Sequence, residues 1–271
     1  MTDSTTIPAA TVASPATILV FDSGLGGLTV FRDVIAARPD ARYIYVADDA
    51  AFPYGDVDED KLIARICAVL GEAITEHSPD LVVIACNTAS TLALKDLRAR
   101  FSVPFVGTVP AIKPACAQSG SKLVAVLGTR ATVGREYTRA LIREFAGGCA
   151  VTLVGSPSLA GFAEAELAGA PVADAEIVGE IAPCFVDEAG RRTDTVVLAC
   201  THYPLLLDRF RALAPWPVVW LDPAPAIARR VADLLSERAP AVQPAPPPRL
   251  IFTSGKSPPS TLATALVRFG F

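Results

Sequence analysis

The chain contains two series of four short apolar runs, and the second series repeats the spacing of the first. The runs, each typical of a buried β-strand, are ILVFD at 18–22, YIYVA at 43–47, LVVIA at 81–85 and PFVGT at 104–108, then LVAVL at 123–127, VTLVG at 151–155, TVVLA at 195–199 and PVVWL at 217–221. The starts of matching runs differ by 105, 108, 114 and 113 residues. Chance similarity among Val-rich strands is the alternative. The third run of each series is completed by the same Ala-Cys pair, which favours an internal duplication.

Longer stretches with helical patterns separate most of these runs. Such alternation is typical of βαβ units with a parallel sheet. A chain of 271 residues is long enough for about two domains. The sequence therefore predicts an α/β fold with two similar halves.

Composition excludes several classes of partner and location. A net charge of −4 gives no basic surface for nucleic acid or an anionic membrane. No apolar run approaches the roughly 18 residues of a membrane span, and residues 1–17 lack the basic and apolar regions of a signal peptide. Six cysteines without a C-x-x-C pair indicate neither a zinc site nor a disulfide framework. We predict a cytoplasmic protein without a metal site.

Ligands of parallel sheets bind beyond the carboxyl ends of the strands, so the residues that follow each run are candidate site residues. DSGLGG at 22–27 has the G-x-G of a dinucleotide site, but Thr29 occupies the sixth position and Asp22 would repel a pyrophosphate. A turn capped by Asp22 and Ser23 explains the glycines but not the acidic residue. PYG at 53–55 is either an ordinary turn or a loop over a small ligand.

One cysteine follows the third run of each series, where a helix should begin. Polar residues that suit a helix cap follow both of them: Asn87 and Thr88 after Cys86, and Thr201 and His202 after Cys200. The positive end of a helix dipole lowers the pKa of a thiol below its usual value of roughly 8.5. We therefore predict that both can be thiolates. The other cysteines, at 67, 116, 149 and 184, are assigned to inert packing.

Two thiols at equivalent strand ends of two facing halves would point into a shared cleft from opposite sides. One base and one acid on opposite faces of a carbon can invert a stereocentre by removing and returning a proton. Racemisation of a free amino acid is the predicted reaction. Asn87, Thr88 and Thr201 could hold the carboxylate of the substrate.

With these motifs, the chain resembles the glutamate racemases of the aspartate/glutamate racemase family. The resemblance extends from Ile18 onward and is carried by FDSGLGGLTV, the PYG loop, ACNTAS, VPAIKPA, a T-x-x-T at 129–132, CTHYPLL and a terminal FTSG. The two cysteine motifs are its most specific part. It implies racemisation of L- and D-glutamate without a cofactor, which supplies D-glutamate for peptidoglycan.

The resemblance also implies an architecture of two α/β domains, related by a pseudo-twofold axis, around a central cleft. The first domain would comprise residues 18–107 and 227–271, and the second residues 108–226. Residues 1–17 would form a disordered tail. The proline-rich stretch at 239–248 would be a stiff connector, after which residues 249–271 would dock back on the first domain.

Roles for the two thiols are likewise implied by the resemblance. Cys86 would act on the D enantiomer and Cys200 on the L enantiomer, each returning the proton that the other removes. Asp22 and Ser23 would lie near the first thiol and the substrate amino group. A carboxylate near a thiol favours its protonated form, so the two thiols should differ in their resting proton.

His202 with an acidic partner would support the second thiol. The implied partner is Glu164, and Glu166 is the alternative because SPSLAGFAE departs from the usual family sequence there. ADDAA at 47–51 also departs from the family, with an arginine lost and a charge gained. The remaining implied pocket residues are Pro53, Tyr54, Gly55, Asn87, Thr88, Thr129, Thr132 and Thr201.

Two other functions share part of this pattern. A racemase for aspartate or another amino acid would have both cysteines, and the length of the pocket would distinguish it. A non-catalytic amino-acid-binding protein would have a cleft but no reason for paired thiols. Glutamate is the predicted small-molecule partner. The sequence is compatible with a homodimer but does not identify its interface.

Overall fold

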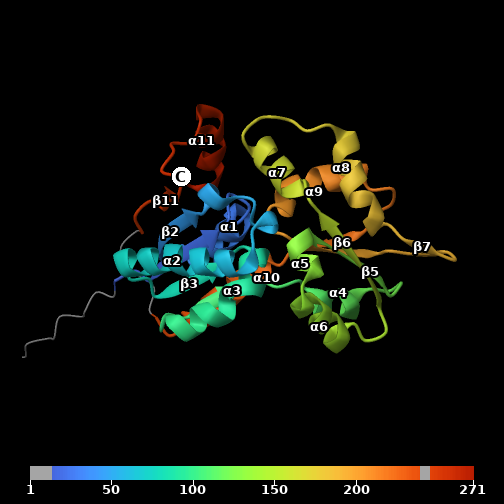
Figure 1. The fold of residues 1–271 in the computed structure, drawn as a ribbon, viewed down its shortest axis with the longest axis horizontal. Helices are drawn as coiled ribbons and strands as arrows, with labels where there is room; N and C mark the ends of the chain where they lie inside the picture. Colours follow the sequence, from blue (N-terminus) through green and yellow to red (C-terminus); the bar gives the residue numbers. More distant parts are fainter. Residues whose placement is uncertain (1–13, 239–244) are drawn as a thin grey trace, which may run out of the picture.

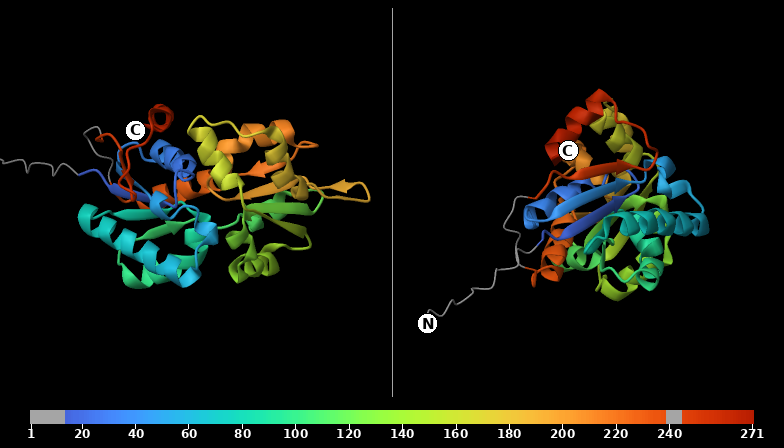
Figure 2. Two further views of the ribbon diagram at one scale, coloured as in Figure 1. Left: turned by 45° about the horizontal axis from the view of Figure 1, so that its top comes forward. Right: turned by 90° about the vertical axis from the view of Figure 1, so that its left-hand side faces the viewer.

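The computed structural model describes residues 14–238 and 245–271 as two lobes that lie side by side (Figure 1, Figure 2). Each lobe contains one parallel sheet. The first sheet consists of β1 (Thr17–Asp22), β2 (Arg42–Ala47), β3 (Leu81–Ile84), β4 (Phe105–Gly107) and β11 (Arg249–Phe252). The second consists of β5 (Leu123–Thr129), β6 (Ala150–Ser156), β9 (Thr195–Ala199) and β10 (Val219–Leu221). The predicted α/β class is confirmed.

The two sheets share one topology. Their strand orders are β11-β2-β1-β3-β4 and β10-β9-β5-β6. We match β1 to β4 in chain order with β5, β6, β9 and β10. The first sheet from β2 onward, and the second sheet when it is followed from β6 to β10, then both have the order second, first, third, fourth. The repeated spacing in the sequence is therefore a repeat of the fold, and the two similar halves are confirmed.

All eight predicted strands are present, with ends within two residues of the prediction. Strand β1 begins at Thr17, inside the predicted tail, because Thr17 pairs with Arg42 of β2; its backbone N–H also donates to Asp80 Oδ2 at 2.8 Å. Two features were not predicted. One is β11, and the other is an antiparallel hairpin of β7 (Asp187–Glu188) and β8 (Arg191–Arg192), which projects from the second lobe (Figure 1).

Helices cover both faces of the first sheet. One face packs on α1 (Leu28–Ala37), α10 (Ala224–Leu234) and α11 (Ser260–Leu266), and the other on α2 (Glu59–His77) and α3 (Asn87–Arg100). In β1, Ile18 and Val20 belong to the first of these layers and Leu19 and Phe21 to the second. Successive side chains of a strand point to opposite faces, so continuous apolar runs are what a sheet buried on both sides requires.

The second sheet is layered in the same way. One face packs on α7 (Leu159–Leu167), α8 (Asp174–Ile181) and α9 (Leu207–Leu213), and the other on α4 (Ile112–Gln118), α5 (Arg130–Gly134) and α6 (Glu136–Phe145). Ala125 and Leu127 of β5 belong to the first layer, and Val124 and Val126 to the second. Full burial of one such Val or Leu side chain stabilises the fold by about 1.5–3 kcal/mol.

The chain returns to the first lobe earlier than expected. The boundary predicted at residue 226 lies inside α10, whose buried residues Ala224, Ile227 and Val231 belong to the core of the first lobe. An amphipathic helix buries its apolar stripe as one unit. The return therefore occurs before Ala224 and not within the helix.

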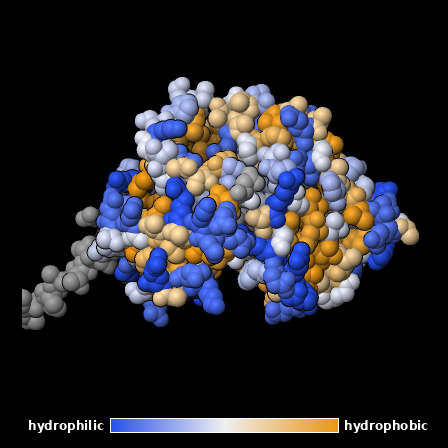
Figure 3. Space-filling view, viewed as in Figure 1, coloured by the Kyte–Doolittle hydropathy of each residue, from blue (hydrophilic) through white to orange (hydrophobic). Residues whose placement is uncertain are grey.

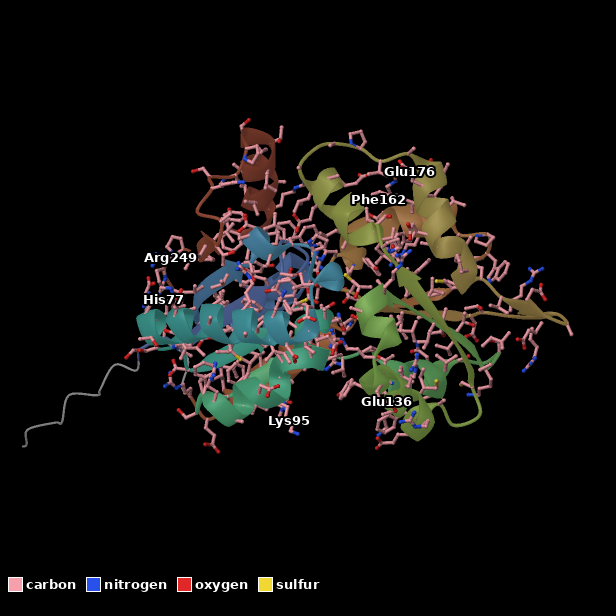
Figure 4. The ribbon with its side chains drawn as sticks, viewed as in Figure 1. His77, Lys95, Glu136, Phe162, Glu176 and Arg249 are labelled. Carbon is pink, nitrogen blue, oxygen red and sulfur yellow. The ribbon has the colours of Figure 1, made fainter. Side chains whose placement is uncertain are left out.

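The C-terminal segment docks on the first lobe. Strand β11 pairs with β2 in parallel, and the ring of Phe271 stacks on that of Phe31, with the centroids 4.9 Å apart. Arg249, the first residue of β11, and His77 lie at the same end of this lobe (Figure 4). Of the predicted stiff connector at 239–248, residues 239–244 lie outside the described part of the chain.

The molecular surface mixes polar and apolar residues. Figure 3 shows the largest hydrophobic area of this view over the second lobe, where the edge strand β6 is half-exposed along much of its length. Among the described residues, no helix combines the length and the apolar character that a membrane span requires.

Candidate active site

Cys86 and Cys200 line one cavity between the two lobes. Both are buried, with 5% and 6% of their surface exposed. The lining comes from both halves of the chain: Ser23, Phe52, Pro53, Tyr54, Gly55, Cys86, Asn87 and Thr88 from the first, and Thr129, Arg130, Ser156, Pro157, Ala160, Cys200, Thr201 and His202 from the second. The other cysteines, at 67, 116, 149 and 184, are not among these lining residues.

The first thiol is held at the start of a helix. Cys86 is the N-cap of α3, and its Sγ accepts the backbone N–H of Ala89 at 3.4 Å and lies 3.6 Å from Ser23 Oγ. Burial nevertheless raises the pKa of Cys86 to about 12, and the charge of Asp22 adds to the rise. The prediction of a thiolate at this position is therefore wrong, because desolvation outweighs the helix N-terminus. Cys86 is a neutral thiol.

Asp22 connects the two halves of the site without lining the cavity. Its buried carboxylate accepts the backbone N–H of Gly24 at 3.0 Å and the Oγ1 hydroxyl of Thr201 at 3.1 Å. Thr201 directly follows the second cysteine. Ser23, in contrast, lines the cavity next to Cys86.

The second thiol lies beside a buried histidine. Cys200 Sγ is 3.8 Å from His202 Nδ1, and His202 Nε2 is 3.0 Å from Glu164 Oε1. The backbone N–H of Gly26 is directed at the same Nε2, 3.1 Å away, and can donate to it only while that nitrogen carries no proton, whereas the N–H of Leu25 donates to Glu164 Oε1 at 2.8 Å. With both ring nitrogens protonated, Nδ1 donates to the sulfur and Nε2 to the carboxylate. Leu25 of the first lobe thus helps to fix an ion pair of the second.

Several forces act on the charge of His202. Burial alone would lower the pKa of this histidine, but its hydrogen bonds to Cys200 and Glu164, together with the charges of Cys200 and Asp22, hold the pKa well above its usual range. The ring is therefore an imidazolium at neutral pH. Glu164 is the residue in contact, whereas Glu166 pairs with Arg209.

The local structure after Cys200 differs from the predicted helix start. A 3-10 helix runs from Tyr203 to Leu206, and α9 begins only at Leu207. Cys200 is thus not the N-cap of an α-helix. The positive charge near this thiol comes from His202 instead.

Asn87 presents unused hydrogen-bonding capacity to the cavity. Its side chain is buried, and among the described residues neither its Nδ2 nor its Oδ1 has a hydrogen-bond partner. A buried amide without partners is destabilising. The side chain is therefore available for a polar ligand in the cavity.

Three threonine hydroxyls meet across the two lobes. Thr88 Oγ1 lies 3.1 Å from Thr129 Oγ1 and 3.2 Å from Thr132 Oγ1, and the last two are 3.0 Å apart. Thr88 and Thr129 line the cavity, whereas Thr132 is fully buried behind them. The predicted T-x-x-T pair therefore contributes one lining residue and one support.

The PYG loop covers the cavity from the first lobe. Pro53, Tyr54 and Gly55 line it. The Tyr54 hydroxyl is directed away to Asp48 Oδ2, at 2.5 Å. The preceding Phe52 packs its ring against that of His202, with centroids 5.3 Å apart. The loop therefore contacts the second lobe as well.

Five lining residues were not predicted: Phe52, Arg130, Ser156, Pro157 and Ala160. Arg130 follows the end of β5 and Ser156 ends β6, so inspection of these strand ends would have found them. Phe52 and Ala160 carry no such signal. Among the described residues, no group of three or more His, Cys, Asp or Glu is placed to hold a metal ion.

The comparisons with known proteins agree with this arrangement. The sequence profile of the Asp/Glu/Hydantoin racemase family matches residues 29–231. A glutamate racemase of Brucella canis is 56% identical over 230 residues, which cover 84% of this chain and 83% of that protein. One of Brucella anthropi is 58% identical over 233 residues, covering 86% and 83%.

Among solved structures, the crystal structure of Escherichia coli glutamate racemase in complex with L-glutamate and the activator UDP-MurNAc-Ala is similar, with a TM-score of 0.87. It is 39% identical to this chain in sequence, and the match covers 95% of this chain and 96% of that one. The family profile matches well over half of this chain, and both curated relatives exceed half identity. The chain therefore belongs to the Asp/Glu/Hydantoin racemase family.

Proposed function

We propose that the protein interconverts L- and D-glutamate by proton transfer between Cys86 and Cys200, without a cofactor. The observation that carries the proposal is that two buried thiols, at equivalent strand ends of two similar lobes, line a single cavity. The names of the relatives support glutamate as the substrate.

The surroundings of the two thiols give the reaction a starting state. Cys200, whose Sγ lies 3.8 Å from the imidazolium of His202, is the base for L-glutamate, while Cys86 retains its proton. In the L-to-D direction, Cys200 removes the α-proton, so that a C–H bond breaks and an S–H bond forms. Cys86 then gives its proton to the opposite face of the carbanion. The product is the D enantiomer, and no electron is gained or lost.

Substrate binding would use the polar groups that face the cavity. The Asn87 amide, which has no hydrogen-bond partner among the described residues, would bind the α-carboxylate together with the N-terminus of α3. Ser23 would contact the amino group. Thr88, Thr129 and Thr201 would supply hydroxyls to the rest of the ligand.

The product would serve peptidoglycan synthesis in the cytoplasm. Expression of the chain should restore growth of a bacterial D-glutamate auxotroph on medium without D-glutamate. The variant in which both thiols are replaced, Cys86→Ser with Cys200→Ser, is the control that must not restore growth.

The decisive test uses purified protein in deuterated water. With L-glutamate, the α-proton signal in the NMR spectrum should disappear while the circular dichroism of the solution decays to zero. The same end point should be reached from D-glutamate. Activity should survive exhaustive dialysis against a chelator.

Parallel reactions with aspartate and alanine separate the alternatives. Faster racemisation of aspartate than of glutamate would replace the proposed substrate. Binding of glutamate without any loss of the α-proton would identify a binding protein. Activity that returns only when a cofactor is added back would refute the cofactor-free mechanism.

A further inference from the structure

The loop that covers the cavity is attached to a buried carboxylate at the end of β2. Asp48 is completely buried, and its backbone N–H donates to the carbonyl of Asp22 at 2.8 Å. Its Oδ2 accepts the Tyr54 hydroxyl at 2.5 Å and Arg65 Nε at 2.7 Å. Its Oδ1 accepts Arg65 Nη2 at 2.6 Å. The carboxylate thus fixes the tyrosine of the PYG loop.

The last partner of Asp48 comes from the far end of the chain. Thr253 follows β11, and its Oγ1 hydroxyl donates to Asp48 Oδ1 at 2.6 Å. The backbone N–H of Thr253 donates to the carbonyl of Ala47 at 3.0 Å, which extends the pairing of β11 with β2. A buried carboxylate remains ionised only if such donors compensate for its lost hydration.

The next residue holds the loop in a second place. Ser254 donates to Asp49 through its backbone N–H, at 2.9 Å, and through its hydroxyl, at 2.5 Å. The FTSG motif at 252–255 therefore fastens both acidic residues that begin the loop.

Neither Thr253 nor Arg65 lines the cavity. Both residues bind Asp48, which in turn binds Tyr54 of the loop that lines the cavity. Phe52 belongs to the same loop, and its ring packs on that of His202. A displacement of the loop would thus change the wall beside Cys86 and the packing beside Cys200 together.

We propose that Thr253, with Arg65, is a positioning residue that holds the loop at 48–55 over the cavity through the carboxylate of Asp48. The inference rests on the proposed function for its effect on glutamate turnover. The C-terminal segment would then be part of the active-site architecture, although it contacts no substrate.

The test compares Thr253→Val, which keeps the shape but removes the hydroxyl, with Thr253→Ser, which keeps the hydroxyl. Thr264→Val is the matched control, because Thr264 is exposed on α11 and its hydroxyl bonds only the backbone of Ser260 among the described residues. Thermal unfolding and far-UV circular dichroism establish that each variant is folded. If Thr253→Val does not fold, Ser254→Ala loosens the same loop at Asp49.

The first readout needs no racemisation. Iodoacetamide modification of Cys200, quantified by mass spectrometry, should be about tenfold faster in Thr253→Val, which removes the hydrogen bond to the charged Asp48 and the one that Oγ1 accepts from the backbone N–H of Ala50 at 3.3 Å. The Thr253→Ser and Thr264→Val proteins should react like wild type. Equal rates in Thr253→Val and wild type would overturn the proposal.

The second readout is the division between KM and kcat. Thr253→Val should raise KM for both enantiomers of glutamate about tenfold and change kcat by less than about threefold, because binding requires the closed loop. A fall in kcat with unchanged KM and unchanged modification would mean that Thr253 is merely structural. If wild type does not racemise glutamate, the proposed function fails while the modification rates still decide the role of Thr253.

Discussion

The two thiols occupy equivalent places in a duplicated fold but have different surroundings. Cys86 caps the α-helix α3 and lies near the carboxylate of Asp22. Cys200 precedes a 3-10 turn and lies 3.8 Å from the ring of His202, which is bound in turn to Glu164. The first thiol keeps its proton, whereas the second lies beside an imidazolium.

This difference shows that a repeated backbone does not repeat its chemistry. The helix N-terminus, which should favour a thiolate, is present at Cys86, where burial keeps the proton in place. At Cys200 the α-helix begins seven residues later, at Leu207, and a side chain supplies the charge. A racemase benefits from this asymmetry, because one thiol must remove a proton while the other delivers one.

Replacement of either thiol should have the largest effect. Cys86→Ser and Cys200→Ser should each lower kcat for racemisation by at least about 10³-fold, because a serine hydroxyl neither gives nor takes the proton at neutral pH. If the thiols divide the work as proposed, Cys86→Ser should still exchange the α-proton of L-glutamate in deuterated water, and Cys200→Ser that of D-glutamate. Cys149→Ser, outside the cavity, is the control. Full activity in either single variant would refute the two-thiol mechanism.

The different charge states can be measured directly through alkylation. Only a thiolate reacts with iodoacetamide, and a pKa raised to about 12 moves the thiolate of Cys86 to high pH. At pH 8, Cys86 should react at least about 100-fold more slowly than Cys200, and its rate should rise about tenfold per pH unit towards that pKa. Quantitative mass spectrometry follows both sites, and the chain unfolded in guanidinium should show no such difference. Similar rates for the two thiols in the folded protein would refute the proposed difference between their charge states.

Substitution of the histidine should expose the asymmetry in turnover. His202→Asn should lower kcat from L-glutamate by about 30-fold and more than kcat from D-glutamate, within the range of acid-base assistance. The equilibrium constant for enantiomers is one, so kcat/KM must fall equally in both directions. The α-deuterium isotope effect in each direction separates these cases. Isotope effects that are equal and unchanged in the variant would leave His202 a structural residue.

The same histidine determines one limb of the pH profile. Because its pKa is raised, the imidazolium persists at neutral pH and is lost as the pH rises through that pKa. In wild type, kcat from L-glutamate should therefore fall on the alkaline side. The profile of His202→Asn should lack that limb.

Substitution of Asn87 should weaken substrate binding without lowering the stability of the fold. Asn87→Leu should raise KM about tenfold, because the amide that faces the cavity is removed. The free energy of unfolding should stay constant or increase by about 1 kcal/mol, because the amide forms no hydrogen bond with any residue that the structure describes. Urea unfolding and steady-state kinetics provide the two measurements. A large loss of stability would show that Asn87 is needed for the fold.

The smallest effect is expected at the carboxylate behind the histidine. Glu164→Gln should lower kcat about fivefold, because a neutral amide stabilises the imidazolium less well. Glu166→Gln should stay within about twofold of wild type, since Glu166 pairs with Arg209 away from the cavity. Initial rates with L-glutamate suffice for the comparison. The reverse ranking would assign the supporting role to Glu166.

Local sequence determined the framework of this protein. Apolar runs with turn residues at their ends defined the eight strands, because strands buried on both faces require unbroken hydrophobicity. The near-constant offsets defined the duplication. The position of a cysteine after the third strand of each half was sufficient to place each thiol at the carboxyl edge of its own sheet, because parallel strands end on the same side.

Tertiary structure decided what depends on burial and on distant parts of the chain. The proton on Cys86 is set by desolvation, which no local pattern reports. The choice of Glu164 over Glu166 depends on which side chain of α7 faces His202. The hydrogen bond between Thr253 and Asp48 joins residues 205 apart in the sequence. Strand β11 was not predicted because it also depends on a distant part of the chain. Its four residues form a strand by pairing with β2.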